Sequence, residues 1–375
     1  MNDLVLKGGR VIDPSQGLDK VTDIAFAGGK VAAIGDNLSG ADTRDIKGRI
    51  LSPGLIDLHT HVYWGGTSLG VEAELLARTG GVTTSIDAGS AGPGNFHGFR
   101  KHVIEPCPVR ILPFLNISFA GIFAFSKTVM LGENVDMRLI DAREAVRVAR
   151  EHKDLILGIK VRVGKSASGS SGIMPLDIAM DVAEKTGLPL MAHLDAPPPS
   201  RHEVMSRLRK DDILTHCFRL FPNAPIAPDG RVRDEILKAR QRGVIFDIGH
   251  GGGSFGFGTT RGMLKAGFLP DVISSDVHVI SIEGPAFDLL TTMSKFLCLG
   301  VDLPTVIKLA TSNAAAAIKR PDLGTLKVGS VGEATVIELK DGKFDYADSI
   351  GEKMIGDKRM VSAGVVLAGK WWHPA

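Results

Sequence analysis

The sequence predicts an α/β fold, a (β/α)8 barrel of the TIM type combined with a small β-sandwich domain built from both chain ends. Apolar runs alternate with amphipathic helical stretches through the middle of the 375-residue chain, which is typical of a parallel sheet covered by helices. Both ends instead carry short β-prone runs separated by Gly and Pro turns. In the middle region, His, Lys and Asp follow the apolar runs, at the rim where such barrels place their functional groups.

Neither terminal segment has enough expected strands to form a stable sheet alone, so we expect the two segments to pair with each other. This places the β-sandwich in residues 1–52 and 322–375 and the barrel in residues 53–321. The expected terminal strands are Leu4–Lys7, Arg10–Ile12, Asp23–Ala27, Lys30–Ile34, Ala334–Glu338 and Gly364–Ala368.

Eight apolar runs are expected to form the barrel, which suits the size of a single (β/α)8 unit. The expected strands are Leu55–Leu58, Val82–Ile86, Val109–Ile117, Leu155–Val161, Leu188–Ala192, Ile213–Thr215, Val244–Ile248 and Asp271–Ser274. The expected helices are Val71–Thr79, Arg138–His152, Leu176–Thr186, Arg201–Lys210, Arg231–Arg242, Thr260–Ala266, Pro285–Leu299 and Pro304–Ile318.

The composition excludes several classes of protein. With 44 basic and 42 acidic residues the net charge is +2, so no basic excess is present to bind nucleic acid or a membrane surface. No apolar run is long enough to span a bilayer, and the N-terminus has no signal-peptide pattern. The three cysteines are too scattered for a disulfide framework or a thiolate zinc site. We expect a cytoplasmic protein that acts on a small molecule, and a homo-oligomer is compatible with the sequence.

The first barrel strand ends in Asp57-Leu58-His59-Thr60-His61. Residues two apart on a strand point to the same face, so His59 and His61 would both face the barrel mouth. Two neutral imidazoles that converge on one point form half of a zinc site. The alternative is a pair of hydrogen-bonded core histidines.

Lys160 ends the apolar fourth strand, where an unpaired ammonium group is costly. Burial would lower its pKa, and the neutral amine could then react with carbon dioxide to give N6-carboxylysine, a carbamate that bridges two divalent metals. The alternative is a lysine whose stem alone is buried, or one held in a salt bridge. His193, His216 and Asp276 end the fifth, sixth and eighth strands and complete a set of ligands for two divalent ions.

At these positions the chain resembles the amidohydrolase superfamily of metal-dependent hydrolases, and the resemblance covers nearly the whole chain. It is carried by Ser52-Pro53-Gly54-Leu55-Ile56-Asp57-Leu58-His59-Thr60-His61, Gly158-Ile159-Lys160-Val161-Arg162, Ala192-His193, Thr215-His216 and Ser274-Ser275-Asp276. The resemblance implies two divalent metal ions, expected to be zinc. His59 and His61 would hold the more buried ion, carboxylated Lys160 would bridge the two, and His193 and His216 would hold the second.

Within this superfamily the chain is similar to a small group of bacterial deacetylases that are related to dihydroorotases. The implied reaction is the cleavage, by metal-activated hydroxide, of an acetyl ester or amide of a small carboxylic acid. Such a substrate would be an acetylated 2-hydroxy acid or an N-acetyl amino acid. Asp276 would bind the first metal, take the proton of the attacking water and pass it to the leaving group.

Candidate substrate contacts follow the strands at Arg162, His250, Ser90 and His278. Arg162 lies two residues after Lys160, so it would face the mouth and pair with a substrate carboxylate. His250 precedes a run of three glycines beside the expected metal site, where it would hydrogen-bond the substrate. For each of these residues the alternative is a structural role in a loop.

Three alternative functions stay open at this point. A cyclic-amide hydrolase similar to dihydroorotases or hydantoinases would share the metals and differ in its loop contacts. A catalytically inactive amidohydrolase-like scaffold would need no metal ligands, although all six are present. The segment Gly251–Gly256 also satisfies the G-x-G-x-x-G pattern of nicotinamide-binding enzymes, but its position in the seventh unit disfavours that function.

Overall fold

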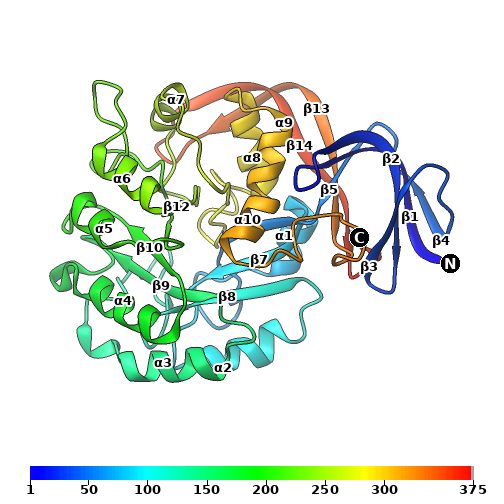
Figure 1. The fold of residues 1–375 in the computed structure, drawn as a ribbon. Helices are drawn as coiled ribbons and strands as arrows, with labels where there is room; N and C mark the ends of the chain where they lie inside the picture. Colours follow the sequence, from blue (N-terminus) through cyan, green and yellow to red (C-terminus); the bar gives the residue numbers. More distant parts are fainter. Residues whose placement is uncertain (373–375) are drawn as a thin grey trace.

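The computed structural model describes residues 1–372 and shows two sheets, one in the barrel and one made by both chain ends (Figure 1). The end of the expected segment 322–375 therefore lies outside the described residues. This arrangement confirms the predicted fold class, in which a curled parallel sheet is joined to a terminal β domain.

The barrel sheet has seven parallel strands that are neighbours in chain order and are almost entirely buried. They are β6 (Leu55–Thr60), β7 (Val82–Ala88), β8 (Arg110–Asn116), β9 (Gly158–Val163), β10 (Leu190–Leu194), β11 (Ile213–Leu214) and β12 (Ile245–Phe246). The expected eighth strand is an irregular segment that closes the barrel: Val272 forms a parallel bridge with Asp247, and Val277 forms one with Thr60.

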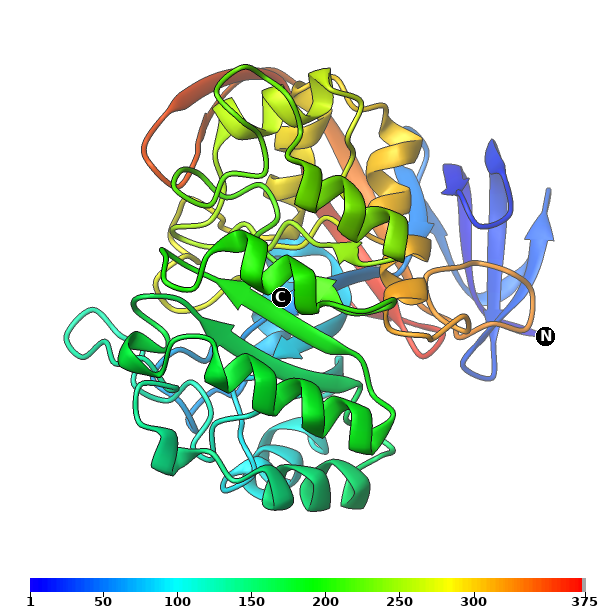
Figure 2. The same cartoon turned by 60° about the vertical axis from the view of Figure 1, so that its left-hand side comes forward.

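Helices lie outside the strands, as Figure 1 and Figure 2 show for α3, α4 and α5. Helix α3 buries one face with Ala145, Val148 and Ala149, whereas α8 is buried on all sides from Leu289 to Phe296. No helix of residues 1–372 combines the length and apolar character needed to cross a bilayer. The longer helices are α1 (Ala73–Gly80), α3 (Ala142–Glu151), α4 (Met174–Thr186), α5 (Arg201–Arg207), α6 (Asp234–Arg242), α7 (Phe257–Lys265), α8 (Leu289–Cys298), α9 (Leu303–Leu309) and α10 (Ser312–Ala317). Single helical turns are α2 (Phe96–Phe99), Arg100–Ile104, Met137–Leu139 and Gly169–Ser171.

The terminal sheet joins the two ends of the chain, as expected. Its strands are β1 (Asn2–Asp13), β2 (Leu18–Ala27), β3 (Lys30–Gly35), β4 (Gly40–Asp45), β5 (Ile50–Pro53), β13 (Ala334–Ala347), β14 (Lys353–Leu367) and β15 (Lys370–Trp372). They form one mixed sheet in the order β15-β14-β13-β5-β1-β2-β3, with β4 paired to β1. The antiparallel pair β5–β13 connects the N-terminal and C-terminal strands, and a separate core that includes Leu4, Phe26 and Val336 lies within this domain.

The β13–β14 hairpin is much longer than the sequence predicts, with 14 and 15 residues in its strands. Its distal half is polar and largely exposed, so it lacks the apolar pattern that identified the proximal half. The hairpin passes over α8 toward the barrel (Figure 1), where the amide of Met360 donates to Ser294 Oγ at 2.9 Å. The terminal domain therefore contacts the barrel through this hairpin.

Candidate metal centre

Two histidines at and just after the end of β6 each have their Nδ1 atom held by a hydroxyl group. His59 Nδ1 lies 2.7 Å from Thr215 Oγ1, and the Thr215 hydroxyl donates to Asp247 Oδ2 at 2.7 Å. Since a hydroxyl has only one proton, Thr215 must accept from the Nδ1–H of His59, which leaves the Nε2 lone pair free. His61 Nδ1 lies 2.8 Å from Ser90 Oγ. Both side chains are thereby held in place, and His59 has its Nε2 available to a ligand.

Asp276 lies opposite these two Nε2 atoms. Its Oδ1 is 3.3 Å from His59 Nε2 and 3.4 Å from His61 Nε2, and the ligand atoms of the three residues all lie within 4.8 Å of one another. Burial raises the pKa of Asp276 to about 6 and lowers the pKa of His61 to about 3. The imidazole is therefore neutral, which is the form that binds metal. Asp276 has a left-handed φ of 48°, a strained conformation often found at functional sites.

Lys160 lies on β9 next to this group and is completely buried. Its Nζ is 3.5 Å from His59 Nε2 and 3.4 Å from Met191 Sδ. Burial lowers the pKa of Lys160 to about 7, so a neutral amine is available near neutral pH. This is the buried lysine with a depressed pKa that the sequence predicts, and its carboxylation stays a prediction.

His216 lies next to His59, and His193 lies next to His216. The ring centroids of His193 and His216 are 4.5 Å apart, and that of His216 is 5.0 Å from that of His59. His216 Nδ1 donates to the Gly249 carbonyl at 2.6 Å, so its Nε2 is free. His193 Nε2 is buried and has no hydrogen-bond partner. A buried unpaired nitrogen of this kind is costly unless a ligand binds it.

This set of donors fits divalent metal ions. His59, His61 and Asp276 form a buried metal-binding group, and the unpaired Nε2 of His193 provides a further free donor. Imidazole nitrogen and carboxylate oxygen are the ligands that zinc and similar ions prefer. The place of Lys160, His193 and His216 as ligands, and zinc as the metal, stay predictions.

Two glycines after β12, Gly249 and Gly251, pack tightly against this centre. A Cβ atom on Gly249 would lie 2.4 Å from Thr215 Oγ1, and one on Gly251 would lie 2.2 Å from Asp276 Oδ2. Both residues also have a left-handed φ, of 45° and 55°, which favours glycine. Of the glycines in the G-x-G-x-x-G pattern, Gly251 is thus explained by packing against the metal centre, whereas a Cβ atom on Gly253 would meet nothing within 4 Å and one on Gly256 would meet Leu220.

A cavity of about 330 Å³ opens onto the centre. Arg162 and His278, two of the four predicted substrate contacts, line it, together with Arg219 and Ser254. Burial lowers the pKa of His278 to about 4, so this ring is neutral. The apolar residues of the lining are Leu69, Ile122, Phe125, Met130 and Ile280.

Ser90 and His250, the other two predicted substrate contacts, do not line this cavity. Ser90 is completely buried, where it holds His61 Nδ1. His250 Nε2 lies 2.7 Å from Lys295 Nζ, and its ring stacks on Phe255 with centroids 4.5 Å apart. The flanking left-handed glycines turn the chain so that His250 packs against α8 and not into the cavity. We therefore correct both expectations: these side chains support the site from behind.

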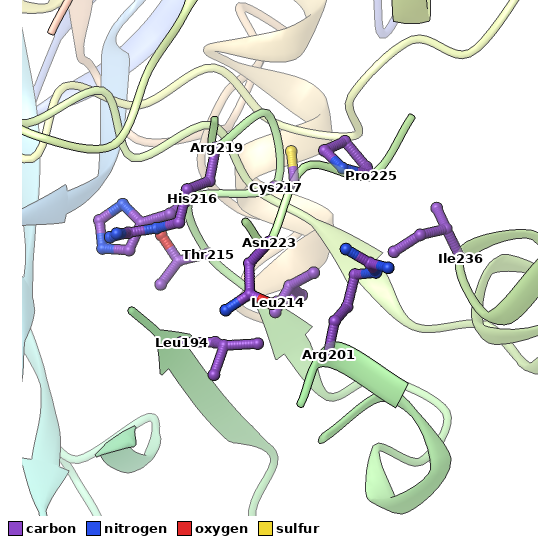
Figure 3. A pocket seen from close by; sticks show the side chains of 10 residues that line it. All are labelled: Leu194, Arg201, Leu214, Thr215, His216, Cys217, Arg219, Asn223, Pro225 and Ile236. Atoms are coloured by element: carbon purple, nitrogen blue, oxygen red, sulfur yellow. The ribbon is translucent and has the colours of Figure 1, made fainter. Parts of the chain in front are cut away.

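Sequence reasoning missed the residues that orient the ligands and several residues of the cavity, among them Arg219. Thr215 and Asp247 hold His59 from strands far away in the chain, and the register that joins them is not visible in the sequence pattern. Arg219 comes three residues after His216, within a turn whose direction no periodicity indicates. Figure 3 shows this turn beside a small pocket, with Cys217 pointing away from the His216 ring, as expected of a residue that is not a ligand.

Comparison with known proteins gives several long matches, whereas no protein-family model matches the chain. The deacetylase Atu3266 of Agrobacterium fabrum is 37% identical over 335 residues, which cover 88% of this chain and 82% of that protein. A dihydroorotase crystal structure matches with a TM-score of 0.91 at 32% identity, covering 100% of this chain and 98% of the other. An adenine deaminase crystal structure matches with a TM-score of 0.91 at 28% identity, covering 100% of both chains. These names denote different reactions, so the shared scaffold alone does not define the substrate.

Proposed function

Because the chain belongs to the amidohydrolase superfamily, we propose that it is a metal-dependent deacetylase acting on an acetyl ester or amide of a small carboxylic acid. Acetylated 2-hydroxy acids and N-acetyl amino acids are the substrates we favour. The observation that carries the proposal is the buried convergence of His59, His61 and Asp276 at the floor of a cavity. The similarity to a deacetylase over most of both chains supports the acetyl group.

The cavity supports an anionic substrate. Arg162 and Arg219 both line it, and both are only partly exposed. A guanidinium in a partly desolvated site binds carboxylates through charge-assisted hydrogen bonds. The apolar residues on the lining leave room for the hydrocarbon part of a small acid and keep bulk water away from the reacting bond.

In this proposal His59, His61 and Asp276 hold one divalent ion, and His193 and His216 hold a second. Lys160, as N6-carboxylysine, would supply a further ligand to these ions. Bound there, two zinc ions supply a Lewis acid for the acetyl carbonyl and activate water as the nucleophile. The hydroxyl groups of Thr215 and Ser90 keep the imidazoles in the orientation that this binding needs.

Asp276 moves the proton. Its carboxylate would accept the proton of the attacking water as a general base. The same group then gives this proton to the leaving alcohol or amine as the bond to the acetyl carbon breaks and acetate forms. One residue thus serves as base and then as acid.

The test is a substrate screen with the zinc-loaded protein and a chelator-treated control. Acetylated 2-hydroxy acids and N-acetyl amino acids of both hands are compared with cyclic ureides. We expect metal-dependent release of acetate from at least one acetylated acid. Ring opening of a cyclic ureide without acetate release would instead favour a cyclic-amide hydrolase, which the similarity to a dihydroorotase structure makes the second candidate. A protein that binds no metal and hydrolyses nothing would favour the inactive scaffold.

A further inference from the structure

The two arginines of the cavity differ in how their charges are balanced. Arg162 Nη1 lies 3.1 Å from Glu133 Oε2, and both side chains are largely buried. Arg219 is in none of the ion pairs formed by residues 1–372. Its Nη2 donates to Ser254 Oγ at 2.7 Å, and its Nε is buried without a hydrogen-bond partner. A shielded cation with neutral partners gains most from an incoming anion.

The carboxylates that share the cavity with Arg219 are engaged elsewhere. Asp195 accepts from the amides of Ser166 at 3.2 Å and Ala167 at 2.9 Å, and Asp276 belongs to the metal-binding group. Burial lowers the pKa of Arg219 to about 10, so the guanidinium still carries its charge at neutral pH. Its place in the cavity wall and its lack of an ion-pair partner among the described residues make it the better receptor for a substrate anion.

The partner of Arg219 is held by the tip of the long C-terminal hairpin. Ser349 Oγ accepts from the amides of Ser254 and Phe255, each at 3.2 Å, and the amide of Ser349 donates to the Phe255 carbonyl at 3.0 Å. Lys295 Nζ donates to the Ala347 carbonyl at 2.9 Å and fixes the start of the tip. The position of Ser254 therefore depends on the terminal domain. The hairpin β13–β14 of that domain extends to the neighbourhood of α7 in Figure 1.

We propose that Arg219 binds the substrate carboxylate and that Ser349 positions Arg219 through Ser254. This inference rests on the proposed function for the class of substrate. It replaces the expectation that Arg162 binds the carboxylate, since Glu133 already neutralises that arginine. The terminal domain thereby takes part in substrate selection although none of its strands enters the barrel.

The first test compares one acetylated 2-hydroxy acid, O-acetyl-lactate of either hand, with its neutral carboxamide. In zinc-loaded Arg219→Met we expect kcat/KM for the acid to fall roughly 10- to 150-fold, mainly through KM, which is the range for a lost charge-assisted hydrogen bond. The carboxamide should change by less than about three-fold, because a neutral group gains little from the guanidinium. Arg219→Lys keeps the charge and should lose less. Equal losses for acid and carboxamide would overturn the assignment.

The second test addresses Ser349. Ser349→Ala removes the acceptor of two amides, and we expect it to raise KM for the acid about five-fold while kcat and the KM of the carboxamide stay unchanged. Ser349→Thr keeps the oxygen and should restore the KM of the acid. A merely structural role would lower metal content or impair both substrates alike, and that result would remove Ser349 from the proposal.

A binding measurement separates this inference from the proposed function. The probes are 2-methoxypropanoate and 2-methoxypropanamide, ether analogues that cannot be hydrolysed, titrated calorimetrically into the zinc-loaded full chain. We expect the wild type to prefer the acid by at least ten-fold and Arg219→Met to lose that preference, even if no acetylated compound is a substrate. A preference that survives in Arg219→Met, or a wild type without any preference, would overturn the role of Arg219, whereas acetate release in the screen would still support the deacetylase.

Discussion

Replacing Thr215 with Val tests the orientation of the metal-binding histidine directly. Valine keeps the size and branching of threonine and removes only the hydroxyl that joins His59 Nδ1 to Asp247 Oδ2, at 2.7 Å on each side. Thr215 is 1% exposed, so water cannot take the place of the hydroxyl. The direct distance from His59 Nδ1 to Asp247 Oδ2 is 3.6 Å, which is too long for a good hydrogen bond. The His59 proton then has no acceptor and can move to Nε2, where it blocks the metal.

Loss of an outer hydrogen bond of this kind lowers metal affinity about 10- to 100-fold, which corresponds to about 1.4–2.7 kcal/mol. The measurement is competition for zinc between the protein and a chromophoric chelator, at one pH, for wild type, Thr215→Val and Thr215→Ser. Thr215→Ser keeps the hydroxyl, so its affinity should match that of the wild type although it loses a methyl group. Wild-type zinc affinity in Thr215→Val would refute the reasoning, and equal losses in both variants would assign the effect to packing.

Three further predictions concern the buried titratable residues. Asp276→Asn should keep at least one equivalent of metal and lose more than about 1,000-fold in kcat, because an amide cannot accept the proton; near-normal turnover by a variant with full metal content would contradict this. Lys160→Ala should lose metal and activity, and millimolar short carboxylic acids should restore part of both if a carbamate normally bridges the ions; metal analysis and acetate release measure it. Burial lowers the pKa of Lys295 from 10.5, its ordinary value, to about 7 in the folded protein. Between these two pH values the unfolded chain therefore binds one more proton than the folded protein. The free energy of unfolding of the wild type, relative to Lys295→Met, should therefore rise with pH from about 7 to 10 by up to about 1.4 kcal/mol per pH unit, and a flat difference in denaturant titrations would show that the pKa of Lys295 is not lowered.

The strand ends could be predicted from the sequence, because an apolar run followed by His, Lys or Asp shows both where a strand stops and which residues reach the rim. The sequence pattern alone indicates His59, Lys160 and Asp276. It failed for His250, since the direction of a side chain after a strand depends on the backbone of the following turn. Two left-handed glycines set that direction here.

Contacts between distant segments were also beyond prediction. Thr215 meets His59 only through the curvature and register of the closed sheet, which local patterns do not encode. The distal part of the β13–β14 hairpin is mostly polar, and only a few of its residues, such as Tyr346 and Met360, pack into the core. Ser349 at its tip consequently gave no sign of its contact with the cavity wall.

The pairing of β5 with β13 also has a consequence for biosynthesis. Nearly the whole barrel is translated between these two strands, which at bacterial and eukaryotic elongation rates takes roughly 15 to 60 seconds. During that interval the nascent chain presents β5 with an open edge, and open edges recruit other chains. A ribosome that stops before residue 334 therefore releases a product prone to aggregate, and chaperone capture at this stage would protect the yield of native protein.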